Sequence, residues 1–148
     1  MNETPITVIF INYNNIDPTI HFKNTDFDIH NVFSVKFPYD YSIILNKEIE
    51  SLLTYLKAIN TAIEINKDKV IICDQLIDID KIKSIYESKE NLVYINSLNG
   101  FMLNSKLYHK FKIQLIKTYK KLIDTKNTFK YSFHKIICKL YKDELIGR

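Results

Sequence analysis

The pattern of apolar and polar positions divides the first third of this 148-residue chain into two strand-like segments. Residues 6–12 (ITVIFIN) form a continuous β-branched and aromatic run, which is typical of a strand buried on both faces. Residues 31–37 (NVFSVKF) alternate apolar and polar side chains, which predicts a second strand that Pro38 ends. The segment between them, residues 13–30, is rich in Asn and Asp and predicts a loop.

Residues 46–66 carry the clearest helical pattern in the chain. Their apolar side chains recur at the spacing of one helix face, and they are Ile49, Leu52, Leu53, Leu56, Ile59 and Ile63. Asn46 is the predicted N-cap, with Glu48 and Glu50 placed to stabilise the first turn.

The rest of the chain continues the alternation of strands and helices. Further strands are predicted at residues 69–73 (KVIIC), 91–96 (NLVYIN) and 101–103, and further helices at 78–88, 105–123 and 129–145. This order favours an α/β domain with a mainly parallel sheet flanked by helices and a C-terminal helical pair. No repeat or linker interrupts the pattern, so residues 1–148 are predicted to form one domain.

The positive charge is concentrated in the last third of the chain. Residues 105–148 hold 12 basic and 3 acidic residues, whereas residues 1–104 hold 9 basic and 14 acidic residues. Such lysines are most often the solvated faces of amphipathic helices. The alternative is a nucleic-acid surface, with aromatic side chains between the lysines at Tyr108, Tyr119, Tyr131 and Tyr141. The only arginine is Arg148, and this makes nucleic acid the least favoured partner.

The cysteine content, the lengths of the apolar runs and the first residues of the sequence predict the cellular compartment. Cys73 and Cys138 match no metal-binding spacing, and two cysteines in a Lys-rich chain fit a reducing environment. The sequence has no apolar run long enough to span a membrane, and its first residues do not resemble a secretion signal. We therefore expect a cytoplasmic protein. The richness in Lys, Ile and Asn is typical of AT-rich coding sequences, including those of some large DNA viruses, for which the host cytoplasm or the virion is the expected location.

Three segments together resemble glycosyltransferase family 25, the lipopolysaccharide and collagen galactosyltransferase-like group with a GT-A fold. TVIFINYNNID resembles the family's first strand and polar turn, and LLTYLKAINTAIEINKDKVIICDQLI resembles its helix, strand and acidic motif. LNGFMLNSKLYHKF resembles its Gly-aromatic strand followed by a capped helix. These segments cover about half of the chain, and their order carries more weight than any one motif.

The resemblance implies a nucleotide-sugar transferase that uses Mn²⁺ or Mg²⁺, with a UDP-sugar as the most favoured donor. Asp74 takes the place of the family's metal-binding acids, and Asp78 and Asp80 are further candidates for that role. The alternative for Asp78 and Asp80 is that they are the cap and a first-turn residue of the helix predicted at 78–88. The departures are Cys73 and Gln75, which stand where the family has acids. Thr54 and Tyr55 also replace the usual Ser-His, and only about two dozen residues separate the acidic motif from the Gly-aromatic strand.

The predicted nucleotide-binding residues follow the first strand. Asn12, Tyr13, Asn14 and Asn15 lie where the carboxyl ends of parallel strands face a ligand, and Tyr13 is suited to stack on a base. The structural interpretation of the same residues is an Asn-rich turn.

Three functions remain open from the sequence. The first is a glycosyltransferase-like domain, active or degenerate, and the second is a non-catalytic binding or interaction protein on the same scaffold. The third is a nucleic-acid-binding module that uses the basic C-terminal helices.

Overall fold

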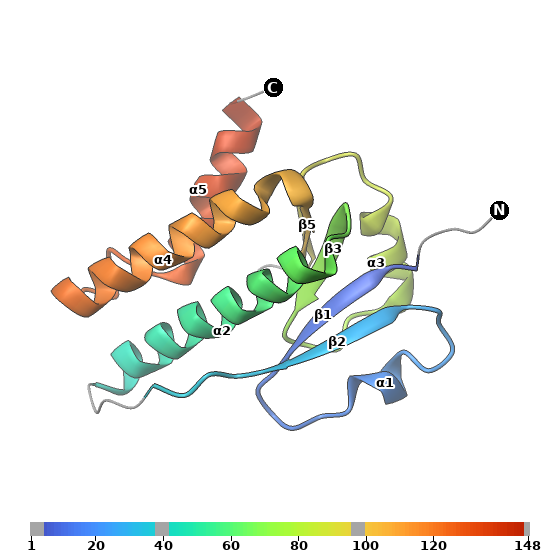
Figure 1. Ribbon diagram of the computed structural model, residues 1–148, viewed down its shortest axis with the longest axis horizontal. Helices are drawn as coiled ribbons and strands as arrows, with labels where there is room; N and C mark the ends of the chain where they lie inside the picture. Colours follow the sequence, from blue (N-terminus) through green and yellow to red (C-terminus); the bar gives the residue numbers. More distant parts are fainter. Residues whose placement is uncertain (1–4, 38–41, 96–99, 147–148) are drawn as a thin grey trace.

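The computed structural model describes residues 5–37, 42–95 and 100–146, and it has an α/β fold around one five-stranded sheet (Figure 1). Across the sheet the strand order is β2-β1-β3-β5-β4. The strands are β1 (Thr7–Asn12), β2 (Asp28–Phe33), β3 (Lys69–Cys73), β4 (Leu92–Ile95) and β5 (Gly100–Asn104).

The sheet is mixed, which corrects the expectation of a mainly parallel sheet. β1 pairs in parallel with β2 and β3, but β5 lies between β3 and β4 and is antiparallel to both. The physical reason is the short connection from Ile95 to Gly100, since only an antiparallel pair can be joined by so few residues. β4 consequently lies at an edge of the sheet.

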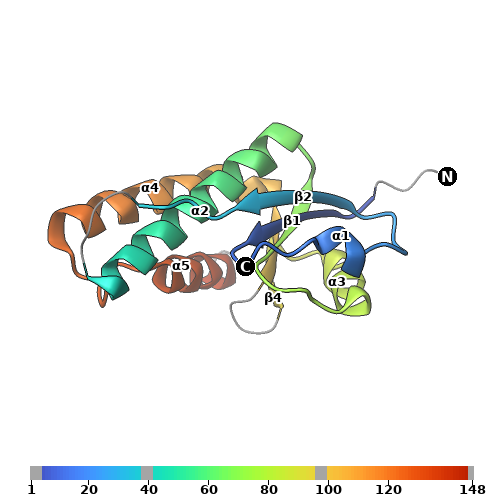
Figure 2. The same cartoon turned by 90° about the horizontal axis from the view of Figure 1, so that it is seen from below.

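Helices cover both faces of the sheet (Figure 2). The long helices α2 (Ile43–Ile65), α4 (Tyr108–Thr125) and α5 (Phe133–Ile146) share the larger core cluster on one face. The short helices α1 (Pro18–His21) and α3 (Ile79–Tyr86) flank the other face, where Phe22 and Ile82 join the smaller cluster. A 3-10 turn, η1 (Ser105–Leu107), leads into α4, and the predicted C-terminal helical pair is confirmed as α4 and α5. None of the described helices is both long and apolar enough to cross a membrane.

Several element boundaries differ from the sequence prediction, and those of α2 and β2 bear on the candidate sites. α2 begins at Ile43, because the Ser42 side chain accepts a hydrogen bond from the Leu45 N–H and acts as the N-cap in place of Asn46. β2 begins three residues earlier than expected and ends at Phe33. The chain after it turns toward α2, where the Val35 N–H donates to Thr54 Oγ1 over 2.9 Å.

Apolar residues of the predicted strands and helices form the core. Leu52, Ile71, Phe111 and Ile137 are at most 1% exposed. The predicted stripe on α2 is confirmed in part: Ile49, Leu52 and Ile59 are buried, but the buried face of the helix is rotated away from the other three positions. Leu56 and Ile63 are only partly buried, while the fully buried positions nearby include Ala58 and Ala62, which let the helix approach its neighbours closely. Phe129, the first residue of the predicted helix 129–145, is 87% exposed, because α5 begins four residues later than expected.

Candidate functional sites

The first candidate site is a group of polar side chains at the carboxyl ends of β1 and β3. The two strands are parallel neighbours with Phe10 opposite Cys73, so the residues that follow them meet at one edge of the sheet. We define the strand-end cluster as Tyr13, Tyr55, Cys73 and Asp74, because the charge of Asp74 acts on each of the other three.

Asp74 is the centre of the strand-end cluster. It is partly buried, and its Oδ1 atom has no hydrogen-bond partner within the described part of the chain. Burial raises the pKa of the Asp74 carboxyl, and a hydrogen bond from its own backbone N–H opposes that rise. Desolvation also favours the neutral form in its neighbours. Burial and the nearby carboxylate raise the pKa of the Cys73 thiol to about 12 and hold the pKa of Tyr55 well above its ordinary value.

The two glutamates near Tyr13, Glu48 and Glu50, accept hydrogen bonds from backbone N–H groups of other segments. Glu48 accepts a 2.6 Å hydrogen bond from the Phe133 N–H at the start of α5, and Glu50 accepts one of 3.1 Å from the Phe37 N–H. Burial raises the pKa of Tyr13, while a hydrogen bond with Ser51 lowers it. The polar groups of α2 therefore connect the segment after β2, the start of α5 and the strand-end cluster.

The three aspartates predicted as metal ligands are not assembled into one site. Asp78 and Asp80 are exposed, and Asp78 precedes α3 without a side-chain cap hydrogen bond. Among residues 5–37, 42–95 and 100–146, no group of three or more His, Cys, Asp or Glu side chains is placed to hold a metal ion. A single carboxyl whose pKa is raised is a weak ligand for a hard divalent cation.

The residues predicted to bind a nucleotide divide into one structural residue and three exposed ones. Asn12 is buried; its amide donates to the Ile16 carbonyl and to Asn31 Oδ1, and its Oδ1 accepts from the Ile16 N–H. Asn12 therefore closes the loop after β1, as the structural interpretation predicted. Tyr13 is 43% exposed, and Asn14 and Asn15 are exposed, with Asn15 in the left-handed conformation.

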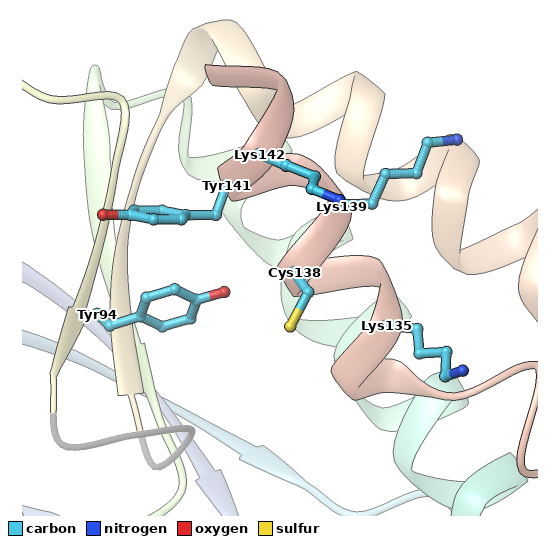
Figure 3. Close-up of a pocket in the computed structure, with 6 residues that line it drawn as sticks. All are labelled: Tyr94, Lys135, Cys138, Lys139, Tyr141 and Lys142. Atoms are coloured by element: carbon cyan, nitrogen blue, oxygen red, sulfur yellow. The ribbon is translucent and has the colours of Figure 1, made fainter. Parts of the chain in front are cut away.

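The second candidate site is a hollow of about 460 Å³ between the edge strand β4 and helix α5 (Figure 3). We call it the basic groove. Its lining residues are two tyrosines, three lysines and a cysteine: Tyr94, Lys135, Cys138, Lys139, Tyr141 and Lys142. In Figure 3 the two tyrosine rings project toward each other from β4 and α5, and their centroids are 5.4 Å apart.

Helix α5 owes its position to contacts with the core. The Phe133 ring stacks on Tyr55 with a centroid distance of 3.9 Å and also contacts Phe101 and Phe111. Ile136, Ile137 and Leu140 are buried on the same face of α5. This face packs inward, so the opposite face presents its lysines at the rim of the groove.

The electrostatics of the basic groove differ from those of the strand-end cluster. Burial, together with nearby Cys138 and Tyr141, raises the pKa of Tyr94 to about 12, so its hydroxyl stays neutral. Lys135 Nζ lies 5.1 Å from the centre of the Phe129 ring. In the described part of the chain, no carboxylate is paired with Lys135, Lys139 or Lys142. The groove thus combines an aromatic wall with ammonium groups that are not neutralised by a described carboxylate.

The groove was not predicted from the sequence. The spacing of Lys135, Lys139 and Lys142 places them on one side of a helix, which was a usable signal. The pairing of Tyr94 with Tyr141 depends on β4 being an edge strand, which was not predicted.

No protein-family model matches the chain, and no curated protein or solved structure matches it significantly.

Proposed function

We propose that this protein is a non-catalytic binding protein on a GT-A-like α/β scaffold, and that the basic groove is its binding site for a negatively charged partner. The observation that carries the proposal is the groove itself, with its volume of about 460 Å³, its two tyrosine rings and its three lysines. Concave sites that combine apolar walls with a few charged groups are the usual form of ligand sites in proteins.

The GT-A-like part of the proposal rests on the order of the elements and on the place of Asp74. Asp74 directly follows β3, an interior strand of the sheet, as the acidic motif does in the family that the sequence resembles. The non-catalytic part rests on the strand-end cluster, where burial favours the protonated carboxyl and where Glu48 and Glu50 hold backbone N–H groups.

The test is fluorescence anisotropy with two labelled anionic probes, a polyglutamate peptide and a thymidine oligonucleotide, at about physiological salt. We expect the triple variant Lys135→Glu, Lys139→Glu, Lys142→Glu to weaken binding roughly tenfold, since each exposed ion pair contributes a fraction of a kcal/mol. The matched control is Lys117→Glu, Lys120→Glu, Lys121→Glu, which makes the same charge change on exposed positions of α4. An equal loss in both variants, or no binding of either probe to the wild type, would contradict the proposal.

A second candidate function is metal-dependent transfer from a UDP-sugar at Asp74. The observation that favours it is that Oδ1 of Asp74 has no hydrogen-bond partner among the described residues, because a bound cation would satisfy that atom. The test is thermal denaturation with UDP in the presence and absence of Mn²⁺, followed by an assay of UDP-sugar hydrolysis. A working site predicts Mn²⁺-dependent turnover that Asp74→Asn abolishes, whereas the non-catalytic proposal predicts no such turnover in the wild type.

A further inference from the structure

The outer edge of β4 carries backbone groups that the sheet does not use. β4 pairs only with β5 among the described strands, and the Asn104 N–H donates to the Asn91 carbonyl over 2.8 Å. Hydrogen-bonded pairs alternate along an antiparallel ladder, so Val93, opposite Met102, bonds inward. Leu92 and Tyr94 then direct their N–H and C=O groups away from the sheet.

A second hollow follows this same edge. It has a volume of about 320 Å³ and is lined by Ser88, Glu90, Leu92, Val93, Tyr94 and Tyr141. Tyr94 and Tyr141 also line the basic groove, so the two hollows adjoin along β4. The free strand edge therefore lies in a depression whose far wall is the lysine-bearing helix α5.

We propose that the β4 edge accepts an extended acidic segment of a partner protein as an added strand of the sheet. This inference rests on the proposed function and names the class of partner. The backbone of the segment pairs with Leu92 and Tyr94, and its alternate side chains point toward α5. Lys135, Lys139 and Lys142 line the groove from α5, and their long side chains can reach carboxylates of the segment, so charge complementarity favours an acidic segment.

Two other occupants fit the same edge less well. The Tyr94 and Tyr141 rings contact each other at 5.4 Å with an angle of 48° between their planes, which leaves no gap for a nucleic-acid base between them. A second copy of this chain joined through its own β4 would place two lysine-bearing α5 helices beside the same junction, and like charges there oppose association.

The experiment uses a fluorescein-labelled nine-residue peptide of alternating Glu and Val and a copy with proline at its central Val. Both peptides carry the same charge, but proline prevents strand pairing. We expect the proline peptide to bind the full chain at least tenfold more weakly. Amide hydrogen exchange supplies the direct readout: binding should slow exchange at Leu92 and Tyr94 and leave Val93 unchanged, since the Val93 N–H already bonds Met102.

A pair of variants separates the backbone from the ring. Tyr94→Val removes the ring and keeps the outward N–H, whereas Tyr94→Pro removes both, and neither change affects a hydrogen bond of the β4–β5 ladder. We expect Tyr94→Pro to bind at least tenfold more weakly than Tyr94→Val. If Tyr94→Pro does not fold, hydrogen exchange in the wild type still decides the question.

The outcomes distinguish this inference from the proposed function. If the two peptides bind equally and their binding depends on the three lysines, strand addition is wrong, but anion binding at the basic groove is supported. Tighter binding of the thymidine oligonucleotide than of the peptide would also overturn strand addition, and it would indicate that the anionic partner is a nucleic acid. Failure of every probe to bind would contradict both, and a concentration-dependent dimer that protects Leu92 and Tyr94 would replace the partner with a second copy.

Discussion

The strand-end cluster and the basic groove differ in whether their charged side chains have hydrogen-bond or ion-pair partners within the described part of the protein. At the strand ends, Asp74 is partly buried and two glutamates of α2 accept backbone N–H groups. At the groove, three lysines of α5 have no described carboxylate partner. The first region uses its polar side chains to hold the fold together, and the second leaves its charges available to solvent and partners.

This difference teaches that proximity to the carboxyl ends of parallel strands is not enough to identify a binding site. Asn12 and Glu48 had the residue types and the positions of ligand-binding groups, yet both make hydrogen bonds within the protein. A charged group is available for binding only when the fold does not need it.

The largest expected effect is that of Phe133→Ala, because Phe133 joins the helix of the groove to Tyr55 of the strand-end cluster. Phe133 stacks on Tyr55 and is 8% exposed, so its loss should cost about 3–5 kcal/mol of the free energy of unfolding. Anion binding should fall with it, since the groove requires a docked α5. Urea denaturation and probe anisotropy measure both effects, and Phe129→Ala, at an 87% exposed position, is the control with an expected change within about 0.5 kcal/mol.

Gly100→Ala should have an intermediate effect, because the strand-end region is closely packed. A Cβ at Gly100 would lie 2.7 Å from Ile77 Cδ1 and 3.0 Å from Cys73 Cβ. We expect a loss of about 1–3 kcal/mol in urea denaturation. Cys138→Ala, on the exposed wall of the groove, should change stability by less than about 0.5 kcal/mol. Similar costs for the two variants would show that the regions do not differ in packing.

Asp74→Asn should stabilise the protein at neutral pH, by on the order of 1 kcal/mol, because an ionised and unpaired buried acceptor is costly. Folding raises the pKa of Asp74, so the folded state binds more protons and loses stability as the pH rises from about 3.9 through the raised value. The advantage of Asn should therefore be absent near pH 3 and complete above the raised pKa. Thermal denaturation across a pH series measures it, and a pH-independent difference would contradict the assigned cause.

Thiol labelling requires no substitution and compares the accessibility of a cysteine in each of the two regions. Cys138 is exposed and should react with a thiol reagent in the folded protein. Cys73 is fully buried with a pKa of about 12, so it should react only on unfolding. The acidic peptide should slow labelling of Cys138 several-fold, and rapid labelling of Cys73 in the native state would show that the strand-end region opens readily.

Much of the fold was predictable because hydrophobic periodicity is a local property. β3 was predicted with its observed bounds, and the helices α2, α3, α4 and α5 were each predicted within a few residues. The direction of β5 was missed although its signal was present, since the short connection before Gly100 allows only an antiparallel turn.

The candidate sites were harder to predict because they depend on contacts between distant segments. The role of Asn12 depends on Asn31 and Ile16, and the groove depends on the contact of Tyr94 with Tyr141. The place of Asp74 at a strand end was correctly predicted, but its missing partner and its burial are tertiary properties. The glycosyltransferase resemblance, the metal and the UDP-sugar stay predictions.

The hydrogen bond from the Phe133 N–H to Glu48 has a consequence for the order of folding. It joins residues that are 85 positions apart in the chain, so it can form only after nearly all of the chain has been made. The parallel strands and α2 come earlier in the chain, so during synthesis they emerge before α5 does. Until α5 docks, Tyr55 and Phe101 lack their Phe133 neighbour and stay exposed to the solvent on that side. The newly made chain thus passes through a stage with an uncovered aromatic surface, the kind of surface to which chaperones bind.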